Sequence, residues 1–144
     1  MSVIKTPDQR VRVFISSTIR ELAAERQAAQ EAIEQLHLLP VLFEMGARPH
    51  PPRELYRAYL EQSHIFVGIY AKSYGWIAPD MTISGLDDEY RLSAGKPRLV
   101  YVKSNVPDRD KKLEEMLLDL QQNGNTSYRY FSTPDELRHL LLND

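Results

Sequence analysis

The sequence predicts an α/β protein built on a five-stranded parallel sheet with helices on both faces. Strand-like apolar runs alternate with amphipathic segments along the chain, which is typical of successive βαβ units. The run IFVGIYA at 65–71 is apolar on both faces of its pleat, as in a central parallel strand. Right-handed crossovers leave few ways to wind such a sheet, and we expect the strand order 2-1-3-4-5.

Three strands and two helices are predicted in the first half of the chain. The run VRVFIS is rich in β-branched residues and ends in serine, which indicates a buried strand. Thr18 and Glu21 have the spacing of a capping box, which predicts the start of a helix. The predicted elements are a strand at 11–16, a helix from Thr18 to about His37, a strand at 40–44, a helix with Pro52 in its first turn, and a strand at 65–71.

The second half supplies three helices and two strands. Ser84 is placed to cap a short helix that Gly95 ends, and Thr133 and Glu136 repeat the capping-box spacing. Aromatic and charged residues alternate in the last strand, which favours an edge position. The predicted elements are a helix at 85–94, a strand at 97–102, a helix at 108–122, a strand at 128–131 and a helix that begins at Thr133.

Length and composition indicate one domain, residues 1–144, with no unusual charge. The chain is 42% hydrophobic and 26% charged, with a formal net charge of −2, so we expect no nucleic-acid binding. The absence of cysteine excludes disulfides, thiolate metal ligands and a cysteine nucleophile. The apolar runs are shorter than the roughly 20 residues that span a bilayer. The segment MSVIKTPDQR lacks the apolar stretch of a signal peptide, so we expect a cytoplasmic protein without membrane binding.

Polar and aromatic residues follow the predicted strands 1 and 3. In a sheet of this order, ligands bind at the carboxyl ends of these two strands, where the order reverses. The side chains there have hydrogen-bonding, cationic or aromatic character. The candidate substrate-binding residues are Ser16, Ser17, Arg20, Lys72, Tyr74 and Trp76.

Most of these candidates also have a structural interpretation. Ser16 and Ser17 suit a phosphate or ribose, but they equally suit the end of a strand. Arg20 has the place of a solvated helix charge. Tyr74 and Trp76 offer a surface on which a flat ring could stack, whereas the alternative is a tryptophan that covers the edge of the sheet.

Three consecutive acids begin the predicted third helix at the same edge. Acids in a first turn complement the helix dipole, which explains most such runs. At 100° per residue the three point in different directions: Glu89 lies beside the inward stripe, and Asp88 faces away. An acid at the margin of a buried face, close to the carboxyl edge of a sheet, is a candidate functional carboxylate.

Several common sites are excluded. No glycine-rich phosphate loop follows strand 1, and no G-x-S-x-G motif is present. The four histidines lack the spacing of metal ligands, so we expect no metal.

Three segments, FISSTIRELAAER, IFVGIYAKSYGW and DDEYRLSAGKPRLVYVK, resemble a family of TIR-like domains of unknown function. The resemblance runs from Val11 to Lys103 and implies a flavodoxin-like fold. The family is in turn similar to Toll/interleukin-receptor domains and nucleoside deoxyribosyltransferases. Its members stand at the N-termini of larger proteins, ahead of NACHT or other STAND NTPases and of TPR or WD repeats. The resemblance therefore implies NTPase or repeat domains in a parent protein.

Enzymatic TIR domains cleave the nicotinamide–ribosyl bond of NAD with a glutamate on the helix after the third strand, and Glu89 occupies the corresponding place. The resemblance implies that Glu89 is catalytic, that Ser16 and Ser17 approach the nucleotide, and that a base or nicotinamide stacks on Trp76. NAD would then be a substrate, and no cofactor is expected. TIR enzymes usually become active on self-association, so a second copy is an expected partner.

The favoured function is that of a TIR-like effector in a prokaryotic defence or signalling system, hydrolysing the N-glycosidic bond of NAD or a related nucleotide. Many TIR domains are adaptors, so a non-catalytic self-association module is the alternative. A nucleotide-sensing domain that binds without cleavage is the third.

Overall fold

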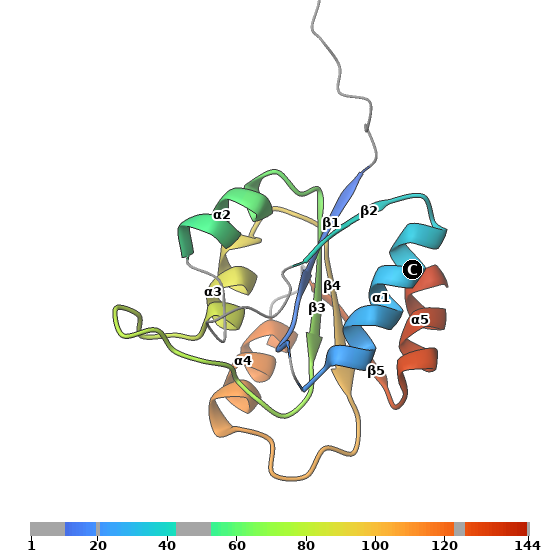
Figure 1. Cartoon of the computed structure of the whole chain (residues 1–144). Helices are drawn as coiled ribbons and strands as arrows, with labels where there is room; N and C mark the ends of the chain where they lie inside the picture. Colours follow the sequence, from blue (N-terminus) through green and yellow to red (C-terminus); the bar gives the residue numbers. More distant parts are fainter. Residues whose placement is uncertain (1–10, 20, 43–52, 123–125, 144) are drawn as a thin grey trace, which may run out of the picture.

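The computed structural model describes residues 11–19, 21–42, 53–122 and 126–143, in which five strands alternate with five helices, as predicted (Figure 1). The strands are β1 (Arg12–Ser16), β2 (Leu39–Val41), β3 (Ile65–Tyr70), β4 (Arg98–Lys103) and β5 (Thr126–Phe131). The helices are α1 (Ala23–Gln35), α2 (Arg53–Glu61), α3 (Gly85–Leu92), α4 (Lys111–Gln122) and α5 (Pro134–Asn143). None of the helices within these ranges has the length and apolar character needed to cross a membrane.

The strands form one parallel sheet in the order β2-β1-β3-β4-β5, which confirms the predicted flavodoxin-like topology. Their carboxyl ends therefore share one edge of the sheet. The chain leaves β1 toward β2 on one side and later reaches β3 on the other. The order thus reverses between β1 and β3, where Ser16 lies opposite Gly68.

Two hydrophobic clusters lie between the sheet and its helices. Helices α2, α3 and α4 cover one face, and α1 and α5 cover the other (Figure 1). Along β3, Phe66 and Tyr70 belong to the first cluster, whereas Val67 and Ile69 belong to the second. Because successive side chains of a strand point to opposite faces, a strand covered on both sides is apolar at nearly every position.

The three predicted helix caps differ in outcome. Ser84 accepts a hydrogen bond from the backbone N–H of Asp87 (3.1 Å), and Thr133 accepts one from that of Glu136 (3.1 Å), so these two caps are confirmed. The cap at Thr18 is wrong, because α1 begins at Ala23 without a side-chain cap.

Glu21 explains the missing cap at the start of α1. Its carboxylate accepts hydrogen bonds from the backbone N–H groups of Lys72 (2.6 Å) and Ser73 (3.1 Å), in the turn after β3. Two convergent donors hold the carboxylate there instead of at the helix start. Among the described residues, Thr18 Oγ1 is consequently buried without a hydrogen-bond partner.

The two edges of the sheet are formed by β2 and β5. The second strand was predicted at Pro40–Glu44, but it covers Leu39–Val41, and residues 43–52 lie outside the described part of the chain. Pro40 suits an edge because it cannot donate a ladder hydrogen bond. Strand β5 forms the other edge, as predicted.

Gly68 is required by a close contact within β3. A Cβ atom at this position would lie 2.6 Å from Tyr70 Oη and 2.8 Å from Tyr70 Cζ. Tyr70 is fully buried, so its ring has no space into which to move. The ring therefore lies back across its own strand, and only glycine leaves room for it.

We predict that Gly68→Ala lowers the free energy of unfolding by about 1–3 kcal/mol, because the added methyl group overpacks the core. Urea denaturation measures the loss. In a Tyr70→Leu background the contacting ring atoms are gone, so the same substitution should cost less. Equal losses in the two backgrounds would show that the contact with the Tyr70 ring is not the cause.

Candidate functional site

Glu89 and Ser16 meet at the carboxyl end of β1. Ser16 is the last residue of β1, and Glu89 lies in α3, on the face of the sheet that α2, α3 and α4 cover. Ser16 Oγ donates a hydrogen bond to Glu89 Oε1 over 2.7 Å, and the side chains are only 1% and 2% exposed. The structure thus brings together two predicted site residues that are 73 positions apart in the sequence.

Asp88 is buried against α2, whereas the sequence pattern predicted that it faces away from the protein. Its carboxylate accepts hydrogen bonds from the Tyr56 hydroxyl (2.5 Å) and from Arg53 Nε (2.7 Å). The prediction was wrong because α2 packs beside α3 and covers a flank that would be solvent-exposed on an isolated helix. Asp88 and Glu89 therefore take their partners from different elements, α2 and β1.

Asp87 is buried as well and holds the segment that precedes α3. It accepts a hydrogen bond from the Tyr74 hydroxyl (2.5 Å) and pairs with Arg91 (2.9 Å), one turn further along α3. The carboxylates of the three consecutive acids thus contact three different parts of the protein.

Across the described residues, no group of histidine, aspartate and glutamate side chains could hold a metal ion.

The two tyrosine hydroxyls stay protonated beside these acids. Burial, followed by the hydrogen bond to Asp88, raises the pKa of Tyr56 far above its usual value. Burial and the hydrogen bond to Asp87 also raise the pKa of Tyr74. Both phenols therefore remain hydrogen-bond donors throughout the physiological pH range.

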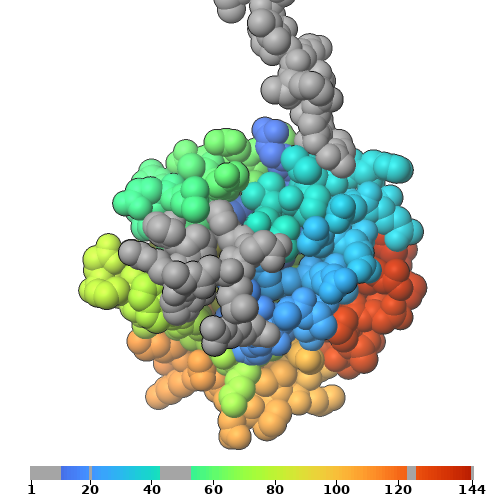
Figure 2. Space-filling view, in the orientation of Figure 1, coloured from blue at the N-terminus to red at the C-terminus, as the bar shows by residue number. Residues whose placement is uncertain are grey.

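The other predicted site residues lie apart from Glu89 or have other partners. Ser17 accepts a hydrogen bond from Arg26 Nη1 (2.8 Å). The Lys72 side chain is exposed, and Trp76 is 37% exposed, in the segment between β3 and α3 that projects from the side of the molecule (Figure 2). Arg20 lies outside the described residues. Tyr74 is packed in the core and reaches the acids only through Asp87.

Tyr70 is a polar group near Glu89 that sequence reasoning missed. It ends β3 and is fully buried, and within the described residues its hydroxyl has no hydrogen-bond partner. Burial, followed by the charge of Glu89, raises the pKa of Tyr70 well above its usual value, and the Ser16 hydroxyl partly opposes that shift. In the sequence, Gly68 was the one signal of this arrangement, because a glycine inside a strand indicates that another group lies close to the backbone.

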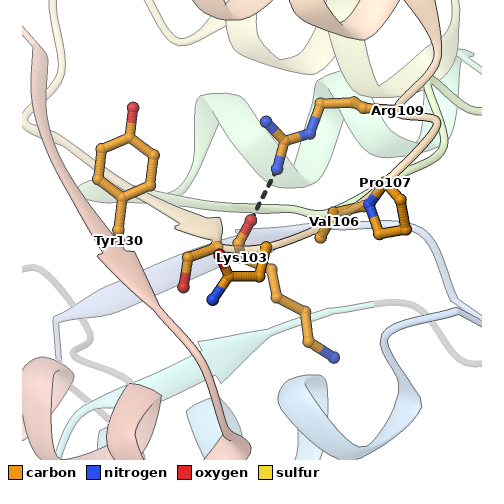
Figure 3. Close-up of a pocket in the computed structure, with 7 residues that line it drawn as sticks. Lys103, Val106, Pro107, Arg109 and Tyr130 are labelled. Carbon is orange, nitrogen blue, oxygen red and sulfur yellow. Dashed lines mark hydrogen bonds between the residues drawn. The ribbon is translucent and has the colours of Figure 1, made fainter.

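An open pocket of about 570 Å³ lies at the same edge of the sheet, beyond the ends of β4 and β5 (Figure 3). Arg109 and Tyr130 stand on opposite sides of it. The Arg109 guanidinium donates to the carbonyl oxygens of Ala71 (2.6 Å) and Lys103 (2.7 Å). The Lys103 side chain points away from Arg109 and pairs with Glu25 (2.9 Å). Both cationic side chains of the pocket, Lys103 and Arg109, thus already have partners within the protein.

We predict that Tyr56→Phe lowers the free energy of unfolding by about 1.5–3 kcal/mol, because Asp88 loses a buried donor. Chemical denaturation at pH 7 measures the loss, and the exposed Tyr128→Phe is the control that should change stability by less than about 0.5 kcal/mol. The folded-state pKa of Tyr56 is raised, so its contribution is complete below about pH 10 and is lost at higher pH. The alkaline decline in stability should therefore be shallower in Tyr56→Phe, and an equally steep decline would contradict this assignment.

Residues 12–144 match a family described as a domain of unknown function, DUF4062. No curated protein matches the chain. The match begins at the first residue of β1 and extends beyond α5, so it includes every strand and helix of the described structure. The chain therefore belongs to the DUF4062 family.

Proposed function

We propose that the chain binds a nucleotide at the carboxyl ends of β1 and β3 and that Glu89 is the carboxylate that acts on it. The observation that carries this proposal is the buried Glu89 carboxylate at the point where the strand order reverses, hydrogen-bonded by Ser16. Sheets of this topology bind ligands at that point. A buried ionisable group near such an edge is a typical functional residue.

The proposed reaction is hydrolysis of the N-glycosidic bond of NAD or a related nucleotide, by a TIR-like effector of a prokaryotic defence or signalling system. The resemblance of DDEYRLSAGKPRLVYVK to enzymatic TIR domains supports it, because those enzymes use a glutamate on the helix after the third strand. Helix α3 follows β3 and carries Glu89. The proposal therefore joins a family resemblance with an independent feature, the burial of that side chain.

A carboxylate suits the chemistry of this bond. The bond between the nicotinamide nitrogen and ribose C1′ breaks, and its electron pair leaves with nicotinamide. Water bonds to C1′ and loses a proton, so NAD and water give ADP-ribose, nicotinamide and a proton. The ribose passes through an oxocarbenium-like state, whose positive charge Glu89 would stabilise.

Self-association without catalysis is the second candidate, and the surface around β5 favours it. Strand β5 is an edge strand whose Tyr128 and Tyr130 are exposed, and Leu118 of α4 is exposed as well. Such an edge offers backbone hydrogen-bonding groups and apolar surface to another strand. The proposed partner is a second copy of the chain.

We predict that Glu89→Gln lowers NAD hydrolysis at least about 100-fold, because the carboxylate charge is lost while an oxygen remains to accept the Ser16 hydrogen bond. The measurement is nicotinamide release by chromatography from protein clustered on a scaffold. The control is Glu115→Gln, which removes an exposed acid of α4 and should leave the rate unchanged.

The outcomes separate the three functions. Turnover that survives in Glu89→Gln removes Glu89 from the mechanism. Nucleotide that raises the melting temperature without turnover indicates a sensing domain. Concentration-dependent association with neither turnover nor nucleotide binding indicates the adaptor.

A further inference from the structure

We propose that Tyr70 is a positioning residue of the same site. When a ligand hydroxyl replaces the Ser16 hydroxyl as the hydrogen-bond donor to Glu89, Tyr70 becomes the new hydrogen-bond partner of Ser16. The inference rests on the proposed function for the identity of the ligand, a nucleotide with ribose hydroxyls. The exchange of partners itself depends only on Ser16, Tyr70 and Glu89.

The Tyr70 hydroxyl lies close to Ser16. Strands β1 and β3 are paired with Ser16 opposite Gly68, and Tyr70 Oη lies over Gly68, at 2.6 Å from where a Cβ would stand. Paired residues of neighbouring strands present their side chains on the same face, about 5 Å apart. The phenol oxygen is therefore brought beside the Ser16 hydroxyl, which in turn donates to Glu89.

Among the residues that the structure describes, none forms a hydrogen bond with the Tyr70 hydroxyl. A fully buried hydroxyl without a partner destabilises the folded state, and phenylalanine would fill the same space without that cost. Thr18 Oγ1, just after β1, is the other buried side-chain oxygen without a partner among the described residues. Both unsatisfied hydroxyls thus belong to the carboxyl ends of β1 and β3, where the proposed ligand binds.

The number of protons at Ser16 and Tyr70 makes the exchange specific. The Ser16 hydroxyl has one proton, which it donates to Glu89 Oε1 in the free protein. When a ligand hydroxyl donates to Glu89 instead, Ser16 loses its partner inside the protein. Tyr70 Oη lies next to it and has free lone pairs, so Ser16 can then donate its released proton to Tyr70 Oη. Tyr70 is fully buried and acts through Ser16, without touching the ligand.

The exchange can be tested without ligand by NMR of the full chain labelled with ¹³C at tyrosine Cζ. Glu89→Met removes the acceptor of Ser16 and fills a similar volume, whereas Glu89→Gln keeps an acceptor and removes the same charge. We expect the Tyr70 Cζ resonance to differ between these two variants, because only Glu89→Met frees Ser16 to bond Tyr70. Adding Ser16→Ala to each should abolish the difference. Identical Tyr70 resonances in Glu89→Met and Glu89→Gln overturn the proposal.

A second measurement covers the case in which Glu89→Met fails to fold. Tyr70→Phe removes the unsatisfied hydroxyl, so we expect its melting temperature to rise by a few degrees. The control Tyr90→Phe removes a hydroxyl that contacts Thr126 Oγ1 (2.9 Å), and its melting temperature should fall. ADP-ribose, followed by calorimetry, should bind about 2- to 12-fold more weakly to Tyr70→Phe, because Ser16 is left unpaired in the complex.

The double-mutant cycle separates this role from a purely structural one. In a Ser16→Ala background, Tyr70→Phe should leave the ADP-ribose affinity unchanged, because no serine needs a new partner. An equal loss of affinity in both backgrounds overturns the exchange. If the wild-type chain binds no nucleotide but the Tyr70 resonances differ as expected, the exchange stands and the proposed function fails.

Discussion

The hydrogen bond from Ser16 to Glu89 joins the carboxyl end of β1 to α3, and the arrangement of the other acids follows from it. Because Glu89 is buried at this contact, α3 has little freedom to rotate or slide on the sheet. A turn of about 100°, one residue along the helix, would place a different acid in the apolar cluster without its partner. The contact therefore fixes which carboxylate of three consecutive acids faces the end of β1.

The two neighbouring acids hold α3 in this orientation from other sides. Asp88 reaches α2 through Tyr56, and Asp87 reaches the segment before α3 through Tyr74. Each buried carboxylate accepts a hydrogen bond from a tyrosine hydroxyl that stays protonated. Breaking either contact would leave a buried charge without this donor and would destabilise the fold. Both acids also pair with arginines on the outer side of the helices. In this chain, the buried carboxylates near the edge of the sheet therefore fix the position and orientation of α3.

Sequence patterns were sufficient for the topology but not for contacts made over long distances in the chain. Alternating apolar periodicities determine which segments become strands and helices, and the two confirmed caps need only neighbours three residues away. The failed cap at Thr18 depends on Glu21 meeting donors 51 and 52 residues later, and no local rule contains that information. The burial of Asp88 likewise depends on where α2 packs. Only Gly68 signals the direction of the Tyr70 ring in the sequence. A glycine inside a strand indicates that some group lies close to the backbone there, but it does not identify that group.

Two places at the carboxyl edge of the sheet compete as the functional site, and the satisfaction of their polar groups distinguishes them. The open pocket beyond β4 and β5 has a volume of about 570 Å³, yet both of its cationic side chains already have partners in the protein: Arg109 donates to two carbonyl groups and Lys103 pairs with Glu25. At the ends of β1 and β3, by contrast, Tyr70 Oη and Thr18 Oγ1 are buried and unsatisfied within the described residues. Folding alone disfavours such groups, because apolar side chains of the same shape would be more stable there. Hydrogen-bonding groups that find no partner among the described residues are a stronger indication of a ligand than open volume, and one of them, Tyr70 Oη, lies near Glu89.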